Sequence, residues 1–475
     1  MIRRQVLDVE VEGTQADGLA LQRRLCAACA DVLSPALAAE LARVDPGDAI
    51  LYVERLEISL SGIARDRLES ELVDAVRKEV ADYFRRHPPV PSGTDRTPAT
   101  SDVELRTAAW TVGEALVVFL RSGRLPWSFR VPPGTRLEQL VLDAWNATTP
   151  EGAIPPATLA RLAELLASRA ARTRLLLQFT DAFVNRLLRT WSPRLTTSAE
   201  EALAALDEPH ASALTGAAFA RAVWDAALAA AAAGQRPGPA DLARTAWESL
   251  TAVGGKDRSL ASPPSLASLA VLLEAHWPGV TETSDAPPAG AEVVPERSRA
   301  TLPIAVPDED AGGLLVDNAG LVLLHPFVPR FFNSLEIADG DELVEPGRAL
   351  SLLHHVATGE LTAPEHQLTL AKVLCDVPLD EPVEADVGLT EAETAEAKAL
   401  LEAAIHHWEA LRATSPDALR GEFLMRPGML TTDIDDGWLL RVEGRAADIL
   451  LDQLPWGISM LKLPWMARMM RVEWR

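Results

Sequence analysis

Prolines limit the length of any element that this chain can form. The 475 residues include 34 prolines, which recur from the first hundred residues to the last twenty. Proline has no backbone N–H and its ring collides with the preceding turn, so it ends or kinks a helix. The longest run of helical spacing covers residues 159–191, between Pro156 and Pro193. A continuous helix between those prolines would extend only about 55 Å, at roughly 1.5 Å per residue. The chain is therefore predicted to fold as several domains of short elements and not as one rod.

Two stretches rich in proline and small residues divide the chain. Residues 88–101 are predicted to be an exposed, extended linker because proline and small polar residues dominate them. Residues 279–313, rich in Pro, Ala, Glu and Ser, are predicted to be a flexible linker. These linkers separate a small α/β module at residues 1–87, a helical domain at 102–278 and a C-terminal domain at 314–475.

The apolar spacing predicts an α+β fold that is mostly α. In the N-terminal module, residues 6–11 and 56–60 alternate as strands, whereas residues 19–44 and 65–86 have helical spacing. Two strands joined by a helix would pair in parallel through a right-handed crossover. Because two strands alone form a marginal sheet, we expect the C-terminal domain or another subunit to complete it. The middle, residues 102–278, is predicted to be almost purely helical and to begin with a helix over 103–121.

The C-terminal domain is predicted to be rich in helices, with a short strand, helix and strand near its end. Residues 438–442 and 470–474 have the strand pattern, and residues 445–454 between them have helical spacing. Residues 321–335 are apolar on all sides, which predicts a buried helix kinked at its two prolines. A Thr-x-x-Glu capping box at 390–393 predicts the start of another helix.

Acidic residues outnumber basic residues along the chain. Lys and Arg total 45 whereas Asp and Glu total 68, which gives a formal net charge of −23. A surface of this sign is repelled by nucleic-acid phosphates and anionic membranes, and it attracts a positively charged protein partner. The sequence has no uninterrupted apolar run of about 18 residues, and its start does not resemble a signal peptide. It predicts a soluble, cytoplasmic protein with no nucleic-acid partner and no membrane insertion.

The cysteines indicate a structural role. An odd count of three, Cys26, Cys29 and Cys375, argues against a disulfide framework and fits a reducing compartment. Cys26 and Cys29 form a CxxC, but they lie at helical spacing among Ala and Leu. A redox or metal site there would need a second pair of ligands or an exposed helix start, and neither is apparent. We interpret the pair as buried structural thiols.

The sequence offers no pattern typical of catalysis. Histidines cluster mildly in the C-terminal domain without an HExxH or similar helical ligand pair. They are His325, His354, His355, His366, His406 and His407. The DIDDG stretch at 433–437 suggests a calcium loop, but Gly444 stands where the bidentate Glu is needed. GxSxG, GxxxxGKS/T and GxGxxG motifs are all missing. We predict no catalytic residue, cofactor or metal, and a protein that is not an enzyme; a hydrolase using these histidines is the least supported alternative.

Three Leu-Pro-Trp triplets, at 125–127, 454–456 and 463–465, are the sharpest local feature. Each sets a rigid turn beside a bulky side chain whose indole N–H needs a partner. One interpretation is anchoring of the core at helix ends, and the other is docking against another protein. Methionines around the last two triplets favour docking there, because methionine-rich surfaces adapt to a partner. The candidate interaction residues are Trp456, Trp465, Met466, Met469, Trp474, Phe327 and Trp127.

Several of these residues also carry a family resemblance. The matching segments are GLVLLHPFVPRFF at 320–332, ATGELTAPEHQLTLAKVLCDVPLDEPV at 357–383 and DDGWLLRVEGRAADILLDQLPWGISMLKLPWM at 435–466, with IRRQVLDVEV near the N-terminus. With these segments the chain resembles the contractile injection system tape measure proteins.

The resemblance implies a structural role in a phage-tail-like contractile particle, linked to tube length and baseplate assembly. Its implied partners are the inner tube and the baseplate or hub proteins, and a homo-oligomer is compatible with it. The chain would act as a tape measure or as an initiator of assembly, and it would leave the cell only as part of a particle. A standalone acidic helical binding protein, or an assembly chaperone, is the alternative.

Overall fold

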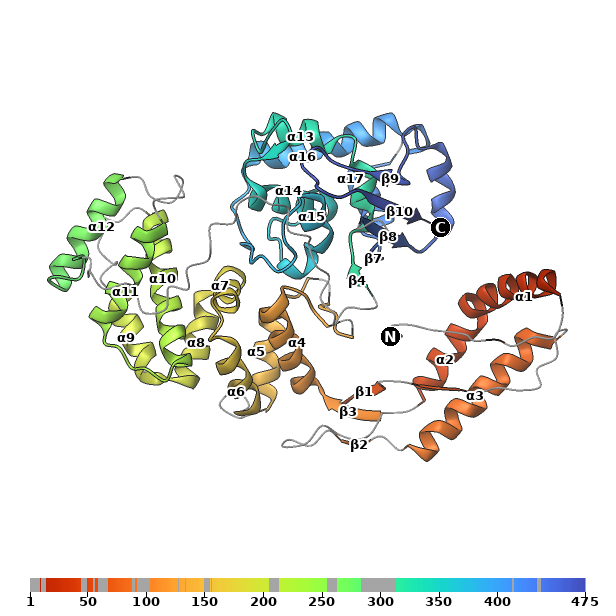
Figure 1. The fold of residues 1–475 in the computed structure, drawn as a ribbon, viewed down its shortest axis with the longest axis horizontal. Coiled ribbons are helices and arrows are strands. Elements are labelled where there is room, and N and C mark those ends of the chain that lie inside the picture. The colour runs from red at the N-terminus through yellow and green to blue at the C-terminus, as the bar shows by residue number, and fades with distance from the viewer. Residues whose placement is uncertain are drawn as a thin grey trace. The chain divides into compact units, whose positions relative to one another are not determined.

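The computed structural model describes most of the chain (Figure 1). The described residues are 9, 14–43, 49–53, 56–58, 67–87, 90–91, 103–126, 128–132, 134–148, 154, 156–204, 213–253, 263–282, 313–411, 414–433 and 437–474. They divide into two compact units, of which one comprises Met1–Glu114 and Pro133–Thr158 and the other Ala115–Pro132 and Leu159–Arg475. The architecture is α+β and mostly α, as predicted from the sequence.

Two helical segments in the first unit share a small apolar core. The first segment consists of α1 (Gln15–Ala28), a π-helical turn (Cys29–Leu33) and α2 (Ser34–Leu41), and the second is α3 (Leu68–Arg86). Their inward side chains, such as Leu37 and Val80, are buried together. The π turn ends two residues before Pro35, whose ring and missing N–H disturb the helical ladder. The two helices predicted for this module are therefore confirmed.

The sheet of the first unit differs from the prediction. It has the order β1-β3-β2, with strands β1 (Ala49–Val53), β2 (Val90–Pro91) and β3 (Val103–Thr107). Strand β1 is antiparallel to β3, and β2 is parallel to β3. The predicted parallel pairing of residues 6–11 with 56–60 falls mostly on residues outside the described part of the chain. Residues 56–58 are not in a strand, and of residues 6–11 only Val9 lies in the described part of the chain.

Strand β3 completes this sheet from a segment that was predicted to be helical. Its sequence, VELRT, alternates apolar and polar residues with the period of a strand, and helix α4 (Ala108–Ser122) begins only after it. The sheet therefore takes its third strand from just beyond the first proline-rich stretch. Most of that stretch, and residues 283–312 of the second, lie outside the described residues.

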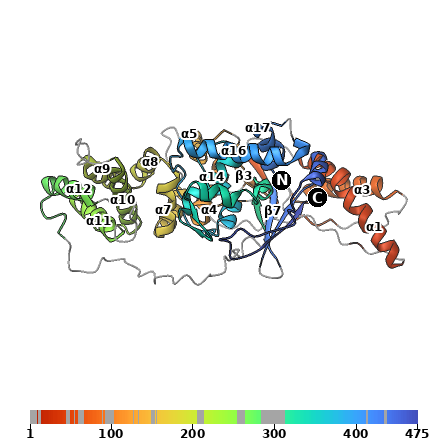
Figure 2. The ribbon, with the colours of Figure 1, turned by 90° about the horizontal axis from the view of Figure 1, so that it is seen from above.

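Short helices follow along the middle of the chain. They are α5 (Leu137–Thr148), α6 (Pro156–Leu165), α7 (Arg169–Gln178), α8 (Asp181–Trp191), α9 (Pro193–Ala204), α10 (Ala213–Ala232), α11 (Pro239–Val253) and α12 (Pro263–His276). In the second unit, α9, α10 and α11 pack against one another (Figure 2).

The single helix predicted over 159–191 is in fact three helices, α6, α7 and α8. The backbone is extended at Ser168, before α7, and at Thr180, before α8. The Thr180 hydroxyl accepts a hydrogen bond from the Phe183 N–H and caps α8, so an N-cap residue with no proline nearby ends the run. The longest α-helix in the described residues is α10, with 20 residues. At roughly 1.5 Å per residue it spans about 30 Å, well short of the length predicted.

A five-stranded sheet organises the C-terminal part of the second unit. Its order is β4-β7-β8-β10-β9, and only β8 and β10 are parallel. The strands are β4 (Leu314–Val316), β7 (Gly428–Thr432), β8 (Trp438–Val442), β9 (Met460–Leu461) and β10 (Met470–Trp474). Strands β8 and β10 are confirmed with the predicted bounds, and the segment between them forms a 3₁₀ helix (Ala446–Gln453). The other three strands were not predicted.

Helices surround this sheet and share one large core with it (Figure 1). They include α13 (Val328–Ser334), α14 (Pro346–Thr358), α15 (Thr369–Leu374), α16 (Glu391–His407) and α17 (Pro416–Leu419). The capping box at the start of α16 is confirmed by reciprocal hydrogen bonds between Thr390 and Glu393.

The helix predicted over 321–335 is not one kinked helix. A 3₁₀ helix (Ala319–Leu324) ends before Pro326, and α13 starts again at Val328 with a proline in its first turn. Gly320 is needed in the 3₁₀ helix because a Cβ there would lie 1.8 Å from the Phe423 carbonyl oxygen. This close approach joins the 3₁₀ helix to the turn that precedes β7.

Candidate interaction surface

Trp465, in the last Leu-Pro-Trp triplet, is part of the core. Its side chain is 8% exposed and stacks on Phe332, with ring centroids 5.4 Å apart. Its indole N–H donates to the Leu374 carbonyl oxygen at 2.8 Å, and the adjacent Met466 is also buried. For these two residues the geometry matches the core-anchoring interpretation, because little of either side chain faces solvent.

Trp456, in the preceding triplet, lies at the edge of the same core and is half-buried. Its indole N–H donates to the Leu323 carbonyl oxygen at 2.9 Å, which fixes the ring. Phe327 packs edge-on against it with ring centroids 5.1 Å apart, and the ring centroid of His407 lies 5.9 Å from that of Phe327. We call Phe327, His407 and Trp456 the aromatic surface; three separate segments contribute to it, and all three side chains retain solvent exposure.

Exposed apolar side chains occur on both sides of Trp456 in the sequence. Met460 is 60% exposed on the edge strand β9, and Met469 is 46% exposed just before β10. Ile449, on the 3₁₀ helix that precedes the triplet, is 69% exposed. Single exposed apolar side chains are common on protein surfaces, so these three do not by themselves mark a contact surface.

Trp474 anchors the final strand to a buried ion pair. Its indole N–H donates to Asp448 Oδ2 at 3.1 Å, and the Arg426 guanidinium lies 5.4 Å from its ring centroid. Arg426 is fully buried and holds both carboxylate oxygens of Asp448, at 2.6 and 3.0 Å. Burial raises the pKa of Asp448, but hydrogen bonds from Arg426, the Arg445 N–H and Trp474 outweigh it and leave this pKa below its ordinary value. Sequence reasoning missed Arg426 and Asp448, because nothing in their spacing marks them as partners.

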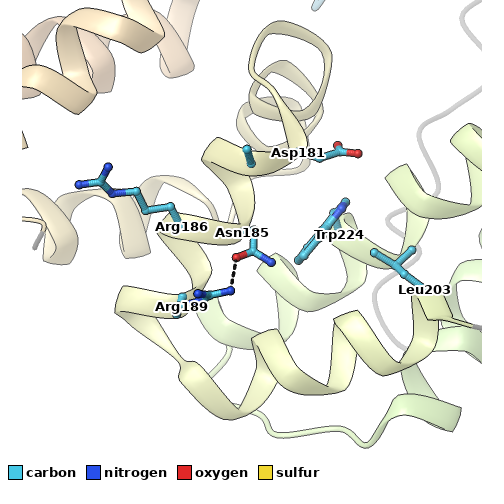
Figure 3. Close-up of a pocket in the computed structure, with 7 residues that line it drawn as sticks. Asp181, Asn185, Arg186, Arg189, Leu203 and Trp224 are labelled. Carbon is cyan, nitrogen blue, oxygen red and sulfur yellow. Dashed lines mark hydrogen bonds between the residues drawn. The ribbon is translucent and has the colours of Figure 1, made fainter. Parts of the chain in front are cut away.

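The second unit also has an open pocket of about 590 Å³ beside α8 (Figure 3). Its lining comprises Asp181, Ala182, Asn185, Arg186, Arg189, Leu203 and Trp224. Arg189 donates to Asn185 and to Glu200, so neighbouring side chains already engage its charge. Asp181 is the only acidic side chain in this lining, and it has no imidazole, thiol or hydroxyl beside it there.

Comparison with known proteins identifies the family. The family model described as contractile injection system tape measure protein matches residues 1–474. This chain belongs to that family. Searches of curated proteins and of solved structures each found no match. The match includes the helical middle, beyond the segments that carried the resemblance, and it places this tape measure protein in a family of structural particle components.

The histidines of the tape measure protein are divided between its core and its surface. Burial lowers the pKa of His354 and of His366 to about 4 each, so both are neutral near neutral pH. His406 and His407 are exposed at the end of α16. Among the residues that the structure describes, no group of three or more His, Cys, Asp or Glu side chains is placed to hold a metal ion.

The remaining sequence predictions have varied outcomes. Trp127 lies outside the described residues, as do positions 434–436 of the DIDDG stretch and the side chain of Cys26. Cys29 is half-buried at the edge of the small core, and Cys375 is buried. Within the described part of the tape measure protein, no helix is both long enough and apolar enough to cross a membrane.

Proposed function

We propose that this tape measure protein acts as an assembly protein whose C-terminal domain docks on a tube, baseplate or hub component through the aromatic surface. The observation that carries the proposal is the set of half-buried and exposed rings of Phe327, His407 and Trp456. Aromatic side chains that are held rigidly lose little entropy on binding and are enriched at binding hot spots.

The charge of the chain indicates the chemistry of the partner. With a net charge of −23, the protein is steered toward a positively charged surface. Aromatic faces also accept Lys and Arg side chains through cation–π contacts. A tube or baseplate component that presents basic and apolar side chains would satisfy both properties.

Initiation of assembly is favoured over direct measurement of length. A simple ruler needs one long element, whereas the longest α-helix in the described residues spans only about 30 Å at roughly 1.5 Å per residue. Folded domains suit the organisation of neighbouring subunits better than the spanning of a tube. Synthesis in the cytoplasm, followed by exit only within a particle, is consistent with this role.

Two measurements test the proposal: the protein composition of purified particles and the length of their tubes. The protein should remain in purified, sheared particles; its absence from them would favour a chaperone instead. Deletion of α12 (Pro263–His276) should leave the lengths of the tubes that form unchanged in electron micrographs. Tubes shortened in proportion to the deletion would indicate a ruler and would contradict initiation.

A further inference from the structure

Helix α7 contacts the C-terminal part of the second unit through a buried arginine. Arg174 is 0% exposed and donates from Nε to Glu365 Oε2 at 2.8 Å. Its other nitrogens donate to the carbonyl oxygens of Leu120, at 2.7 Å, and Asp380. The guanidinium thus joins three segments that are far apart in the sequence. We call the contacts between α7 and residues 365–385 the α7 interface.

Further contacts across the α7 interface are polar as well. Gln178 donates to the Val383 carbonyl oxygen at 2.8 Å and accepts from the Glu365 N–H at 2.9 Å. The Ala385 N–H donates to the Leu177 carbonyl oxygen at 3.1 Å. Polar groups of this kind can exchange their partners for water, so separating such an interface is less costly than opening an apolar core.

An exposed ion pair between α10 and Glu384 lies beside the α7 interface. Arg221 Nη2 lies 2.6 Å from Glu384 Oε1, and the two side chains are 40% and 41% exposed. Exposed pairs contribute little to stability because water and salt screen them. This pair is therefore a peripheral contact that can be altered without disturbing a buried group.

The buried charges at the α7 interface do not balance. Glu365 also accepts from Lys372 Nζ at 2.7 Å, so one carboxylate serves two cations. Lys372 donates in addition to the carbonyl oxygens of Leu379 and Glu381. Burial lowers the pKa of Lys372, and the charge of Arg174 lowers it further, whereas Glu365 and Glu381 oppose that shift. Like charges repel strongly where water is excluded.

Separation of α7 would leave the buried charged groups with partners, and the Glu365 and Ala385 amides would donate to water instead. Glu365 would keep Lys372 as a one-to-one ion pair inside the C-terminal domain, and the guanidinium of Arg174 would enter water. The repulsion between the two cations would be relieved at the same time. A buried ion pair contributes specificity more reliably than net stability, which suits a contact that forms in one register and can open.

We propose that α7 and the C-terminal domain form a releasable latch, centred on Arg174 and Glu365, which opens without unfolding either side. The latch is a property of the protein without any bound partner, and it does not depend on the proposed docking function. It provides two arrangements of one polypeptide, with the surface of residues 378–385 either covered by α7 or available to another partner.

Hydrogen exchange of the full-length protein tests the latch. The Glu365 and Ala385 amides donate across the α7 interface, whereas the amides of β8 report on the core sheet. We expect the two interface amides to exchange through a local opening, faster than the β8 amides. Arg221→Ser should accelerate them by roughly two- to fivefold and leave β8 unchanged. The matched control is Arg189→Ser, which removes an exposed pair with Glu200 and should change neither set.

A second variant opens the latch without removing a polar group. Gly123 has φ +74°, and a Cβ there would lie 2.1 Å from Glu365 Oε1, so Gly123→Ala acts as a wedge. It should accelerate exchange of the interface amides by roughly tenfold or more while β8 stays protected. The latch is overturned if the Glu365 and Ala385 amides exchange as slowly as the β8 amides in the wild type and still exchange at the β8 rate in Arg221→Ser. If Gly123→Ala fails to fold, the Arg221→Ser comparison decides the question.

Discussion

The indole N–H of Trp456 donates to the carbonyl oxygen of Leu323, 133 residues earlier in the chain, at 2.9 Å. This bond holds a half-buried ring at the edge of the core beside Phe327. Trp465, nine residues later in an identical triplet, is buried instead. The two tryptophans therefore allow docking and folding to be tested separately.

Trp456→Ala should lower the yield of particles roughly tenfold or more while the protein remains folded, because a hot-spot side chain dominates its interface. Particle counts by electron microscopy, together with circular dichroism of the purified variant, would check this. Val344→Ala is a matched control, since that side chain is 58% exposed and lies outside the aromatic surface and the candidate interaction residues. Normal particle yield from Trp456→Ala would remove the support for docking at this surface.

Trp465→Ala should act on stability. The ring is stacked on Phe332 and hydrogen-bonded to Leu374, so its loss leaves a cavity and an unpaired carbonyl. We expect the free energy of unfolding to fall by about 3–5 kcal/mol, measured by urea denaturation. A fall below about 1 kcal/mol would mean that the core closes around the missing ring.

Asp448→Ala should also destabilise the fold, by about 3–5 kcal/mol, because it leaves Arg426 charged and buried without its carboxylate. Arg441→Ser, which breaks the exposed pair with Glu473 on the same sheet, should change stability by less than about 1 kcal/mol. Equal losses in the two variants would contradict the assignment of Arg426 and Asp448 as the buried anchor of β10.

Acid should weaken the start of α16. The Arg348 guanidinium, with help from Thr390, lowers the pKa of Glu393 to about 2 from its ordinary value of 4.5, against the opposing effect of burial. Because the folded-state pKa is the lower one, this carboxylate stabilises the fold above pH 4.5, and that contribution is lost as the pH falls toward 2. The difference in unfolding free energy between wild type and Glu393→Gln should shrink over this interval. Glu391→Gln, at an exposed position in the same turn, is the control.

Gly320→Ala should prevent proper closure of the C-terminal core, because the new Cβ would lie 1.8 Å from a backbone oxygen that cannot move aside freely. We expect poor yield or a large loss of thermal stability. Gly347→Ala, in the first turn of α14, meets no atom within 4 Å and should be neutral or stabilising by about 0.5–1 kcal/mol. A stable Gly320→Ala variant would contradict the packing of the 3₁₀ helix.

The sequence predicted those elements that are marked by a short pattern of neighbouring residues. The capping box of Thr390 and Glu393 marked the start of α16, and alternation marked β8 and β10. The run over 159–191 was misread because its breaks are extended residues at N-caps and contain no proline. The Thr180–Asp181 pair, an N-cap followed by an acid in the first turn, was the available signal.

Contacts between distant segments could not be predicted from one sequence. Arg174 and Glu365 are 191 residues apart, and neither stands out by composition or spacing. The same limit explains why two identical Leu-Pro-Trp triplets have different burial. Phe332 and Leu374 enclose Trp465, whereas Phe327 and Leu323 leave Trp456 at the edge.

The order of the five-stranded sheet has a consequence for synthesis. Strand β4 ends at Val316, but its neighbour β7 begins only at Gly428, after all the helices from α13 to α17. During translation, β4 must therefore emerge from the ribosome long before the strand that pairs with it exists. Contacts of such long range form slowly and leave apolar segments uncovered in the meantime. The apolar side chains of β4, Leu314 and Val316, therefore stay without this partner strand until more than a hundred further residues have been made.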